Sequence, residues 1–459
     1  MRLLLLLVIA LTAAPLAAQT IEFRAPDGTV RGQVSLAEAG WAMAFSLDPA
    51  VEWLAGPLPG GAAAVATVVP ASVDSVVVVS AVEALDAAAI LRSASASPGD
   101  LWARAAVGAG RGKVFVVGLS SPQSKGDLPF RDRGEYVMVD VFYGTDRART
   151  GSVEPASFYG GDRGSLEYGR AVVSVPKGHT VGELESPAWW RFEFSQDPAK
   201  HIILQDVVPL GREAALAQIR GAVAKSDDQS AFVFIHGYNV GFEEAARRTG
   251  QLAYDLSFDG APIFFSWPSD ASVRLYTRDE ADVEWAWPHL YEFLRDVARE
   301  TGASRVHVIA HSMGNRAVTS ALKEFARSGA ELPVFDQVLL AAPDIDAQVF
   351  AEQIAPVIPP VARRVTLYAS SRDKALAASK AVHGYPRAGD SGDGLVVIDG
   401  IDTVDASSVD TDLLGHGYYA DAEPILQDVY MVLEAGIEPE RRGLVPRLKE
   451  VLRYWVLGL

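Results

Sequence analysis

The chain has 459 residues, and its composition, 49% hydrophobic and 22% charged, is that of a globular protein large enough for more than one folded unit. A formal net charge of -17 disfavours binding to nucleic-acid phosphates or to anionic lipid, because both need an excess of lysine and arginine. The absence of cysteine excludes disulfides, thiolate metal sites and a cysteine nucleophile.

The N-terminal segment has the three-part layout of a secretory signal peptide. Arg2 precedes an apolar run, Leu3–Leu11, and small residues with Pro15 follow. We expect residues 1–18 to be cleaved after Ala18, because the run is too short to span a bilayer comfortably. No other segment reaches the roughly 18 uninterrupted apolar residues of a membrane span, so the mature form should have no stable span. An exported chain without cysteine fits a bacterial periplasm, or secretion from a bacterium.

Residues 19–125 are rich in Ala, Val and Gly and predict a small α+β module of unknown role. Two apolar runs, Val73–Val82 and Lys113–Leu119, are typical of buried strands, and Val82–Arg92 has helical composition. The polar segment 126–135, which Pro and Gly interrupt, is expected to be a linker to a second domain at residues 136–459.

The second domain opens with strands and continues with a regular alternation. Its first part predicts the strand Val137–Gly144, a Gly-rich loop at Tyr159–Gly169, and the strands Ala171–Pro176 and His201–Val208. Helices are then expected at Arg212–Lys225, Phe242–Asp255, Glu280–Thr301, Asn315–Arg327 and near Gln348–Ala355. Strands are expected at Ala231–Ile235, Pro262–Trp267, Val306–Ala310, Gln337–Ala341, Arg364–Ala369 and Gly394–Ile398, before a helical C-terminal region. This alternation predicts an α/β fold, a mostly parallel sheet covered by helices on both faces, with ligands at the carboxyl edge of the strands.

The sharpest motif is the segment Ala310-His311-Ser312-Met313-Gly314. It follows an apolar strand and opens a helix, which is the strand–turn–helix setting of a nucleophile elbow with the pattern G-x-S-x-G. Alanine replaces the first glycine of that pattern and adds only one methyl group to a turn that needs small residues. We predict that Ser312 is a nucleophile rather than an ordinary serine N-cap.

A tetrahedral oxyanion needs two backbone N–H donors. One is expected from Met313, the residue after the nucleophile, and the other from the loop after the strand Ala231–Ile235. We assign this second donor to Tyr238, with Asn239 as the alternative. His236 is expected to brace the loop.

A serine nucleophile needs a general base and a carboxylate that orients it, and in this arrangement the chain order is serine, acid, histidine. His416 lies in a glycine-flanked loop after the last expected strand and is the predicted base, with His383 as the alternative. Asp373, just past the strand Arg364–Ala369, is the predicted acid. Asp344, past the preceding strand, is the alternative acid or a cap of the helix that follows.

Seven segments together resemble a bacterial α/β-hydrolase family of unknown function in the esterase/lipase superfamily. They are VFYGTDR, LEYGRAVVSVPKGH, FIHGYN, AHSMGN, LAAPDID, LYASSRDKAL and GHGYY, and they lie between about residues 136 and 420. The resemblance implies an α/β-hydrolase core with a Ser–Asp–His triad, which Ser312, Asp373 and His416 match. It implies no substrate, and the region before Tyr136 lies outside it.

No metal and no cofactor are expected, because the sequence has neither a Gly-rich phosphate loop nor an HExxH motif. The six aspartates between Asp393 and Asp412 lack the spacing of an EF-hand and are expected in solvated loops. The aromatic side chains of Trp267, Trp285, Trp287 and Tyr276 would either line an acyl pocket or pack in the core.

The sequence therefore predicts an exported serine hydrolase that acts on small-molecule carboxylic esters or lipids, with amides and thioesters left open. An acyltransferase with the same triad, and a non-catalytic envelope protein that retains the fold, are the alternatives. The oligomeric state and the role of residues 19–125 are not indicated.

Overall fold

The computed structural model describes separate strands before residue 120 and most of the chain from residue 130 onward. With their side chains, it describes residues 130–186, 196–270, 276–372, 376, 379–380, 383–408, 424–433 and 436–457. The chain divides into two compact units. The first is Met1–Gly126 with Ile437–Leu444, and the second is Asp127–Gly436 with Val445–Leu459.

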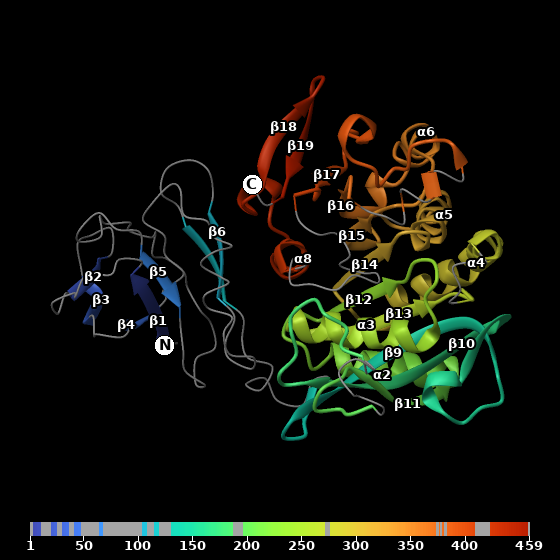
Figure 1. Cartoon of the computed structure of the whole chain (residues 1–459), viewed down its shortest axis with the longest axis horizontal. Helices are drawn as coiled ribbons and strands as arrows, with labels where there is room; N and C mark the ends of the chain where they lie inside the picture. The colour runs from blue at the N-terminus through green and yellow to red at the C-terminus, as the bar shows by residue number, and fades with distance from the viewer. Residues whose placement is uncertain are drawn as a thin grey trace. The chain divides into compact units, whose positions relative to one another are not determined.

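The first unit contains a five-stranded antiparallel sheet with the strand order β2-β3-β4-β1-β5, and a separate antiparallel pair, β6 and β7 (Figure 1). The strands are β1 (Leu3–Ala10), β2 (Thr20–Arg24), β3 (Val30–Ser35), β4 (Trp41–Ser46), β5 (Ala64–Thr67), β6 (Ala103–Val107) and β7 (Val114–Gly118). β7 coincides with the expected strand Lys113–Leu119, whereas Val73–Val82 and Val82–Arg92 lie outside the described residues. The expected signal peptide contains β1, and its cleavage after Ala18 stays a prediction.

The second unit is built on a twelve-stranded mixed sheet with the order β11-β10-β9-β13-β12-β14-β15-β16-β17-β19-β18, and β8 pairs with β9. The eight strands from β9 to β19 in this order run parallel to one another, whereas β8, β10 and β18 pair antiparallel with the ends of this run. The strands are β8 (Phe130–Asp132), β9 (Tyr136–Arg149), β10 (Tyr159–Pro176), β11 (Ile203–Leu210), β12 (Ser230–Ile235), β13 (Gly260–Ser266), β14 (Arg305–His311), β15 (Phe335–Ala341), β16 (Ala362–Ala369), β17 (Asp402–Asp405), β18 (Val445–Lys449) and β19 (Leu452–Val456). The mostly parallel sheet expected from the sequence is thus confirmed.

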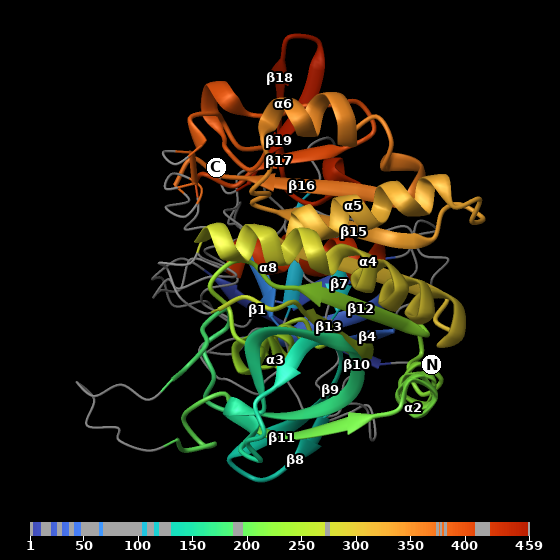
Figure 2. The same cartoon turned by 90° about the vertical axis from the view of Figure 1, so that its right-hand side faces the viewer.

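Helices cover both faces of this sheet: α4, α5 and α6 lie on one face, and α3 and α8 on the other (Figures 1 and 2). The helices are α2 (Arg212–Val223), α3 (Phe242–Asp255), α4 (Tyr276–Glu300), α5 (Gly314–Arg327), α6 (Ala347–Val349), which continues as a π-helix at Phe350–Ile354, and α8 (Glu423–Ala435). The central strands β12 and β13 are buried along their whole length, because they are covered from both sides. None of the helices in the described part of the chain combines the length and the hydrophobicity that crossing a bilayer requires.

The expected Gly-rich loop Tyr159–Gly169 is wrong, because these residues form the first half of β10. The ladder with β9 runs through them with two register shifts, on either side of Arg163. At Gly169 a Cβ atom would lie 2.3 Å from the hydroxyl oxygen of Tyr143 on the neighbouring strand, so the glycine makes room for a cross-strand tyrosine.

The expected strand Gly394–Ile398 is also wrong, and the sheet instead uses Asp402–Asp405 as β17. Leu395 and Val396 are buried, but the N–H of Leu395 closes a 3-10 turn onto Gly392, and the carbonyl of Val396 accepts from the Thr403 hydroxyl. These residues are buried but do not pair with a neighbouring strand, so the segment has the apolar sequence of a buried strand without being one.

Two other expectations differ from the structure. The C-terminal region is not wholly helical, because the hairpin β18–β19 follows α8. The expected linker contains the strand β8.

A buried ion cluster fastens the segment after β10 to α3. The ring of His179 contacts Glu185 through Nδ1 and Asp255 through Nε2, at 2.8 Å each, and all three side chains are largely or fully buried. Burial lowers the pKa of His179, but the charges of the two carboxylates and their hydrogen bonds outweigh it and raise the pKa to about 10. The histidine is therefore an imidazolium that donates from both nitrogens, and it ties residues 179–185 to the sheet-covering helix.

The raised pKa sets the pH window in which this cluster stabilises the fold. Its contribution is fully present below the unfolded pKa of about 6.5 and is lost as pH rises through the folded value of about 10. We expect His179→Gln to lower the free energy of unfolding by about 3–5 kcal/mol near pH 6, since it leaves two buried carboxylates unpaired. The deficit relative to wild type should shrink steadily between pH 7 and pH 10 in urea unfolding followed by tryptophan fluorescence.

His307→Gln is the matched control for this experiment. Burial, and then the charge of Arg305, lower the pKa of His307 to about 3, so this ring is neutral in both states above pH 7. The stability difference between wild type and His307→Gln should stay constant from pH 7 to pH 10. A constant difference for His179→Gln over the same range would contradict the charged cluster.

Candidate active site

Ser312 lies in the turn between β14 and α5, at the carboxyl edge of the parallel strands. Its φ is +48°, in the left-handed region that residues other than glycine rarely occupy, and the residue is 7% exposed. Its N–H donates to the carbonyl of Ala341 on β15, 2.9 Å away. This is the backbone conformation that a nucleophile elbow requires.

The buried side chain of Asn315 supports the elbow from the first turn of α5. Its Nδ2 donates to the carbonyls of Ser312 (2.9 Å) and Ala341 (3.1 Å) and, at 3.4 Å, to that of Ala310. The amide N–H of Asp344 reaches the same Ser312 carbonyl at 3.2 Å. These bonds join the ends of β14 and β15 to the helix and hold the strained residue in place.

Two glycines allow the loop after β12 to pack against the elbow. A Cβ atom at Gly237 would lie 2.9 Å from both the Cβ of Ser312 and the Nδ1 of His311. A Cβ atom at Gly314 would lie 2.3 Å from the carbonyl oxygen of His236. Neither position has room for a side chain, so the structure brings together the two loops from which we expected the oxyanion donors.

The candidate donors differ in what their amide groups already bind. The N–H of Asn239 donates to the carboxylate of Asp279 at 3.2 Å, and Asn239 itself has a φ of +60°. Among the described residues, the N–H groups of Tyr238 and Met313 have no acceptor. Of the two candidate donors in this loop, the N–H of Tyr238 is thus the one that does not already bind an acceptor among the described residues.

His236 braces this loop, as the sequence predicts. Its Nδ1 donates to the carbonyl of Gly237 at 2.8 Å, and its Nε2 lies 3.1 Å from the hydroxyl of Ser266. The ring stacks on Trp267, whose indole N–H donates back to the His236 carbonyl at 2.9 Å. Burial, followed by the charge of Arg147, holds the pKa of His236 well below its usual range, so the ring is neutral.

The guanidinium of Arg147, at the end of the VFYGTDR segment, is the main brace of this edge of the sheet. It is 2% exposed and donates to the Ser266 hydroxyl and to the carbonyls of Val240, Ser269 and Gly160, at 2.8–2.9 Å. A further contact of 3.4 Å joins it to Nε2 of His236. Burial lowers its pKa to about 10, against the opposing charges of nearby aspartates. One side chain thus connects β9, β10, the end of β13 and the loop that carries Tyr238.

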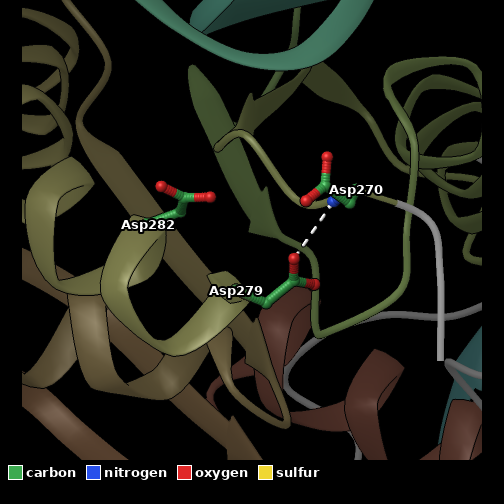
Figure 3. Close-up of side chains that lie close together, drawn as sticks. All are labelled: Asp270, Asp279 and Asp282. Atoms are coloured by element: carbon green, nitrogen blue, oxygen red, sulfur yellow. Dashed lines mark hydrogen bonds between the residues drawn. The ribbon is translucent and has the colours of Figure 1, made fainter. Parts of the chain in front are cut away.

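Three of those aspartates lie together (Figure 3): Asp279 and Asp282 on α4 and Asp270 before it, with ligand atoms within 4.8 Å of one another. Three carboxylates could hold a cation, but arginines supply positive charge here. Arg278 pairs with Asp270 at 3.0 Å and Arg163 with Asp282 at 2.5 Å. Asp279 accepts from the Ser269 hydroxyl and from two backbone N–H groups, including that of Asn239. The cluster therefore serves to order the loops that frame the elbow.

Asp344, the alternative acid, lies in a separate buried network. Ser379 and Arg387 contact its Oδ1 at 2.5 and 3.0 Å, while Tyr276 and Arg316 contact its Oδ2 at 2.5 and 3.6 Å. Both oxygens are thus engaged by groups other than histidine. The helix cap after β15 is instead made by Asp346, whose Oδ1 accepts from the N–H groups of Gln348 and Val349.

The alternative base, His383, is engaged at the edge of the same network. Its Nε2 lies 2.8 Å from Glu280, and its Nδ1 lies 2.8 Å from the carbonyl of Ser379. The predicted base His416 and the predicted acid Asp373 lie outside the described residues, so their assignment stays a prediction.

The aromatic residues Trp267, Trp285 and Tyr276 pack within the fold. Trp267 is fully buried against His236, Trp285 lies under the guanidinium of Arg163 at 5.0 Å, and Tyr276 packs edge-on against Tyr238 at 5.1 Å. An apolar pocket does adjoin the elbow, but none of these residues lines it.

Residues 212–433 match the family model described as "Alpha/beta hydrolase of unknown function (DUF900)". The second unit thus contains an α/β-hydrolase domain that is similar to this family over just under half of the chain. A solved structure of a cold-adapted esterase from an Arctic intertidal metagenomic library, in complex with polyethylene glycol, is 10% identical over 62% of this chain and 92% of its own, with a TM-score of 0.28. No curated protein matches the chain. The match to the family model and the geometry of the elbow carry the assignment.

The hydrolase contains functional side chains to which the sequence pattern gave no role. Arg147 and Asn315 both occur in motifs that carry the family resemblance, VFYGTDR and AHSMGN. An arginine or an amide within an otherwise apolar strand or turn signals a buried polar brace, since such groups are rarely buried without partners. The partners themselves come from distant segments and could not be inferred from spacing.

Because Ser312 has a left-handed backbone, we expect glycine to be more stable than alanine at this position, the reverse of the usual order inside a helix. Ser312→Gly and Ser312→Ala both remove the hydroxyl, but only glycine adopts a positive φ without strain. We therefore expect the Gly variant of the hydrolase to be more stable than the Ala variant by about 1 kcal/mol in urea unfolding.

Ser320, in the interior of α5, provides the control. There the order should reverse, with Ser320→Gly less stable than Ser320→Ala by about 1 kcal/mol, because glycine is a poor helix former. If both positions favour alanine equally, Ser312 is not held in a left-handed conformation in solution.

Proposed function

We propose that this α/β-hydrolase is an exported serine hydrolase that cleaves carboxylic esters or lipids through an acyl-enzyme. The observation that carries the proposal is the left-handed Ser312 between a parallel strand and a helix, packed against the loop of Tyr238. A backbone strained at a serine and held by surrounding bonds is typical of a nucleophile. A serine that only capped α5 would adopt extended backbone at no such cost.

In the proposed mechanism, the hydroxyl of Ser312 attacks the ester carbonyl while His416 accepts its proton. Asp373 orients the ring of His416 and stabilises its charged form. The alkoxide then leaves as an alcohol with a proton from His416, and an acyl group remains on Ser312. A water molecule, deprotonated by His416, attacks this acyl group, and the carboxylic acid is released.

Two features of the described residues support stabilisation of the oxyanion. The N–H groups of Tyr238 and Met313 have no acceptor among the described residues, and both belong to segments that pack together at Gly237. The positive end of the α5 dipole begins next to Ser312 and favours negative charge there. Arg147 and Asp279 hold the loop of Tyr238, so these donors need no rearrangement during the reaction.

The contacts of the neighbouring polar groups support the choice of triad. Asp344 has both oxygens engaged, His383 is bound to Glu280, and His236 is a neutral brace. None of the three is arranged as a general base or its orienting acid. We therefore propose His416 as the general base and Asp373 as the acid that orients it.

Labelling with a fluorophosphonate probe tests the nucleophile. Such probes phosphonylate an activated serine and leave unactivated hydroxyls unmodified. We expect stoichiometric labelling of the wild-type hydrolase, no labelling of Ser312→Ala, and a loss of esterase kcat of at least about 10³-fold in that variant.

Ser320→Ala serves as the control, because it removes a hydroxyl from the same helix without touching the elbow. It should be labelled like wild type. Equal labelling of Ser312→Ala and wild type, or no labelling of either, would overturn the proposal. Replacement of His416 or Asp373 by Ala should also abolish labelling, whereas His383→Ala should not.

Export is proposed from the leader pattern at residues 1–18. Expression in a bacterium with an intact export pathway should yield a mature protein whose N-terminus is Gln19, recovered from the periplasm or the medium. N-terminal sequencing would read this directly. Recovery of the full-length chain from the cytoplasm would contradict export.

A further inference from the structure

An apolar pocket lies directly beside the elbow, between the sheet and the helices α3 and α8. It has a volume of about 590 Å³, part of it open to solvent. Its floor is formed by the ends of β14, β15 and β16, including Ile309 and Leu339. Its walls are Leu252 from α3 and Ile425 and Val429 from α8.

The pocket offers almost no polar group to a ligand. Three polar side chains line it, those of His311, Tyr368 and Ser370. The hydroxyl of Tyr368 donates to Asp428 at 2.6 Å, and the hydroxyl of Ser370 accepts from the N–H of Arg372 at 3.1 Å. Alanines at positions 341, 342, 369 and 406 widen the space between the strand ends and α8. A lining of this kind favours an aliphatic or other apolar group over a sugar, a nucleotide or a peptide backbone, each of which needs hydrogen-bond partners.

The pocket borders the elbow through two residues next to the nucleophile. His311 lines it and directly precedes Ser312, and consecutive Cα atoms are only about 3.8 Å apart. Ala341 also lines it, and its carbonyl accepts the N–H of Ser312 at 2.9 Å. Ser312 does not itself line the pocket, so an acyl group on its hydroxyl has to extend past His311 to enter it.

We propose that this pocket binds the acyl chain of the substrate, so that the hydrolase prefers esters of medium-length aliphatic acids to acetate esters. This inference rests on the proposed function, because it assigns the acyl side of the same reaction. Each methylene group moved from water into the pocket contributes about 0.8 kcal/mol, about fourfold in affinity. Chain-length preference is therefore a sensitive measure of whether the pocket is used.

Val429 is the position at which to test the pocket. It lies on α8, is 6% exposed and lines the cavity. Val429→Phe should fill part of the cavity, and Val429→Ala should enlarge it. With p-nitrophenyl octanoate and p-nitrophenyl acetate as substrates, we expect wild type to favour octanoate in kcat/KM. The ratio should fall roughly tenfold in Val429→Phe and should not fall in Val429→Ala.

Val432 provides a matched control, one helical turn further along α8. It is fully buried but does not line the pocket. Val432→Ala removes the same atoms as Val429→Ala, so it reproduces any general loosening of the helix. Its octanoate-to-acetate ratio should stay within about twofold of wild type.

Binding of sodium octanoate, measured by calorimetry, separates this inference from the proposed function. We expect octanoate to bind Ser312→Ala as well as wild type, and to bind Val429→Phe at least tenfold more weakly. If neither ester is hydrolysed, the proposed function fails, and the octanoate titrations still decide whether the pocket binds an acyl chain. A different result would overturn only the pocket assignment. In that case both esters are hydrolysed in a Ser312-dependent manner, but Val429→Phe behaves like Val432→Ala in both the ester ratio and the octanoate titration. The proposed hydrolase function would then still be supported.

Discussion

A single buried cation, the guanidinium of Arg147, holds together the edge of the sheet at which the active site is proposed. Among the described residues no carboxylate lies at hydrogen-bonding distance from it, and it is satisfied by carbonyls, a hydroxyl and an imidazole from three separate segments. The aspartates around it compensate its charge from further away. A buried charge with this many partners has one low-energy arrangement, because moving any partner leaves a desolvated group unpaired. The geometry of the loop that carries Tyr238 is therefore fixed by Arg147, on a strand almost a hundred residues earlier in the chain.

This constraint explains how a serine can be kept in a left-handed conformation. The elbow is braced from the helix side by Asn315, and from the loop side by backbone that approaches closely at Gly237 and Gly314. His236 links the two sides, since its carbonyl lies against Gly314 and its ring is held by Trp267 and Arg147. Strain at one residue persists only when its surroundings leave no alternative, and here each neighbour is itself held by a buried bond.

The sequence predicted the parts of the fold that depend on local periodicity. The alternation from Arg212 to Ala369 predicted the parallel sheet and its helices within a few residues, and the helix at Phe242–Asp255 agrees at both ends. The prediction from sequence failed where a buried apolar segment does not pair as a strand. In Gly394–Ile398 the apolar residues Leu395 and Val396 are buried but unpaired, while Asp402–Asp405, in which three of four residues are polar, is the strand that pairs with β16. The elbow was predictable because a strand, a tight turn and a helix are all local. The role of Arg147 was not, because its partners come from residues 160, 240, 266 and 269, which no spacing rule connects.

The place of β9 within the sheet also bears on where the folding unit of this domain begins. The match to the family model starts at Arg212, after β11, yet β9 is an interior strand that pairs with β13 on one side and β10 on the other. A fragment that starts at Arg212 would expose the ladder edge of β13 and would lack the cation that organises the neighbouring loops. Such an open edge is a template for intermolecular strand pairing. The segment that sequence comparison recognises is therefore shorter than the unit that folds, and β8–β11 have to be transferred with it whenever the domain is recombined or expressed by itself.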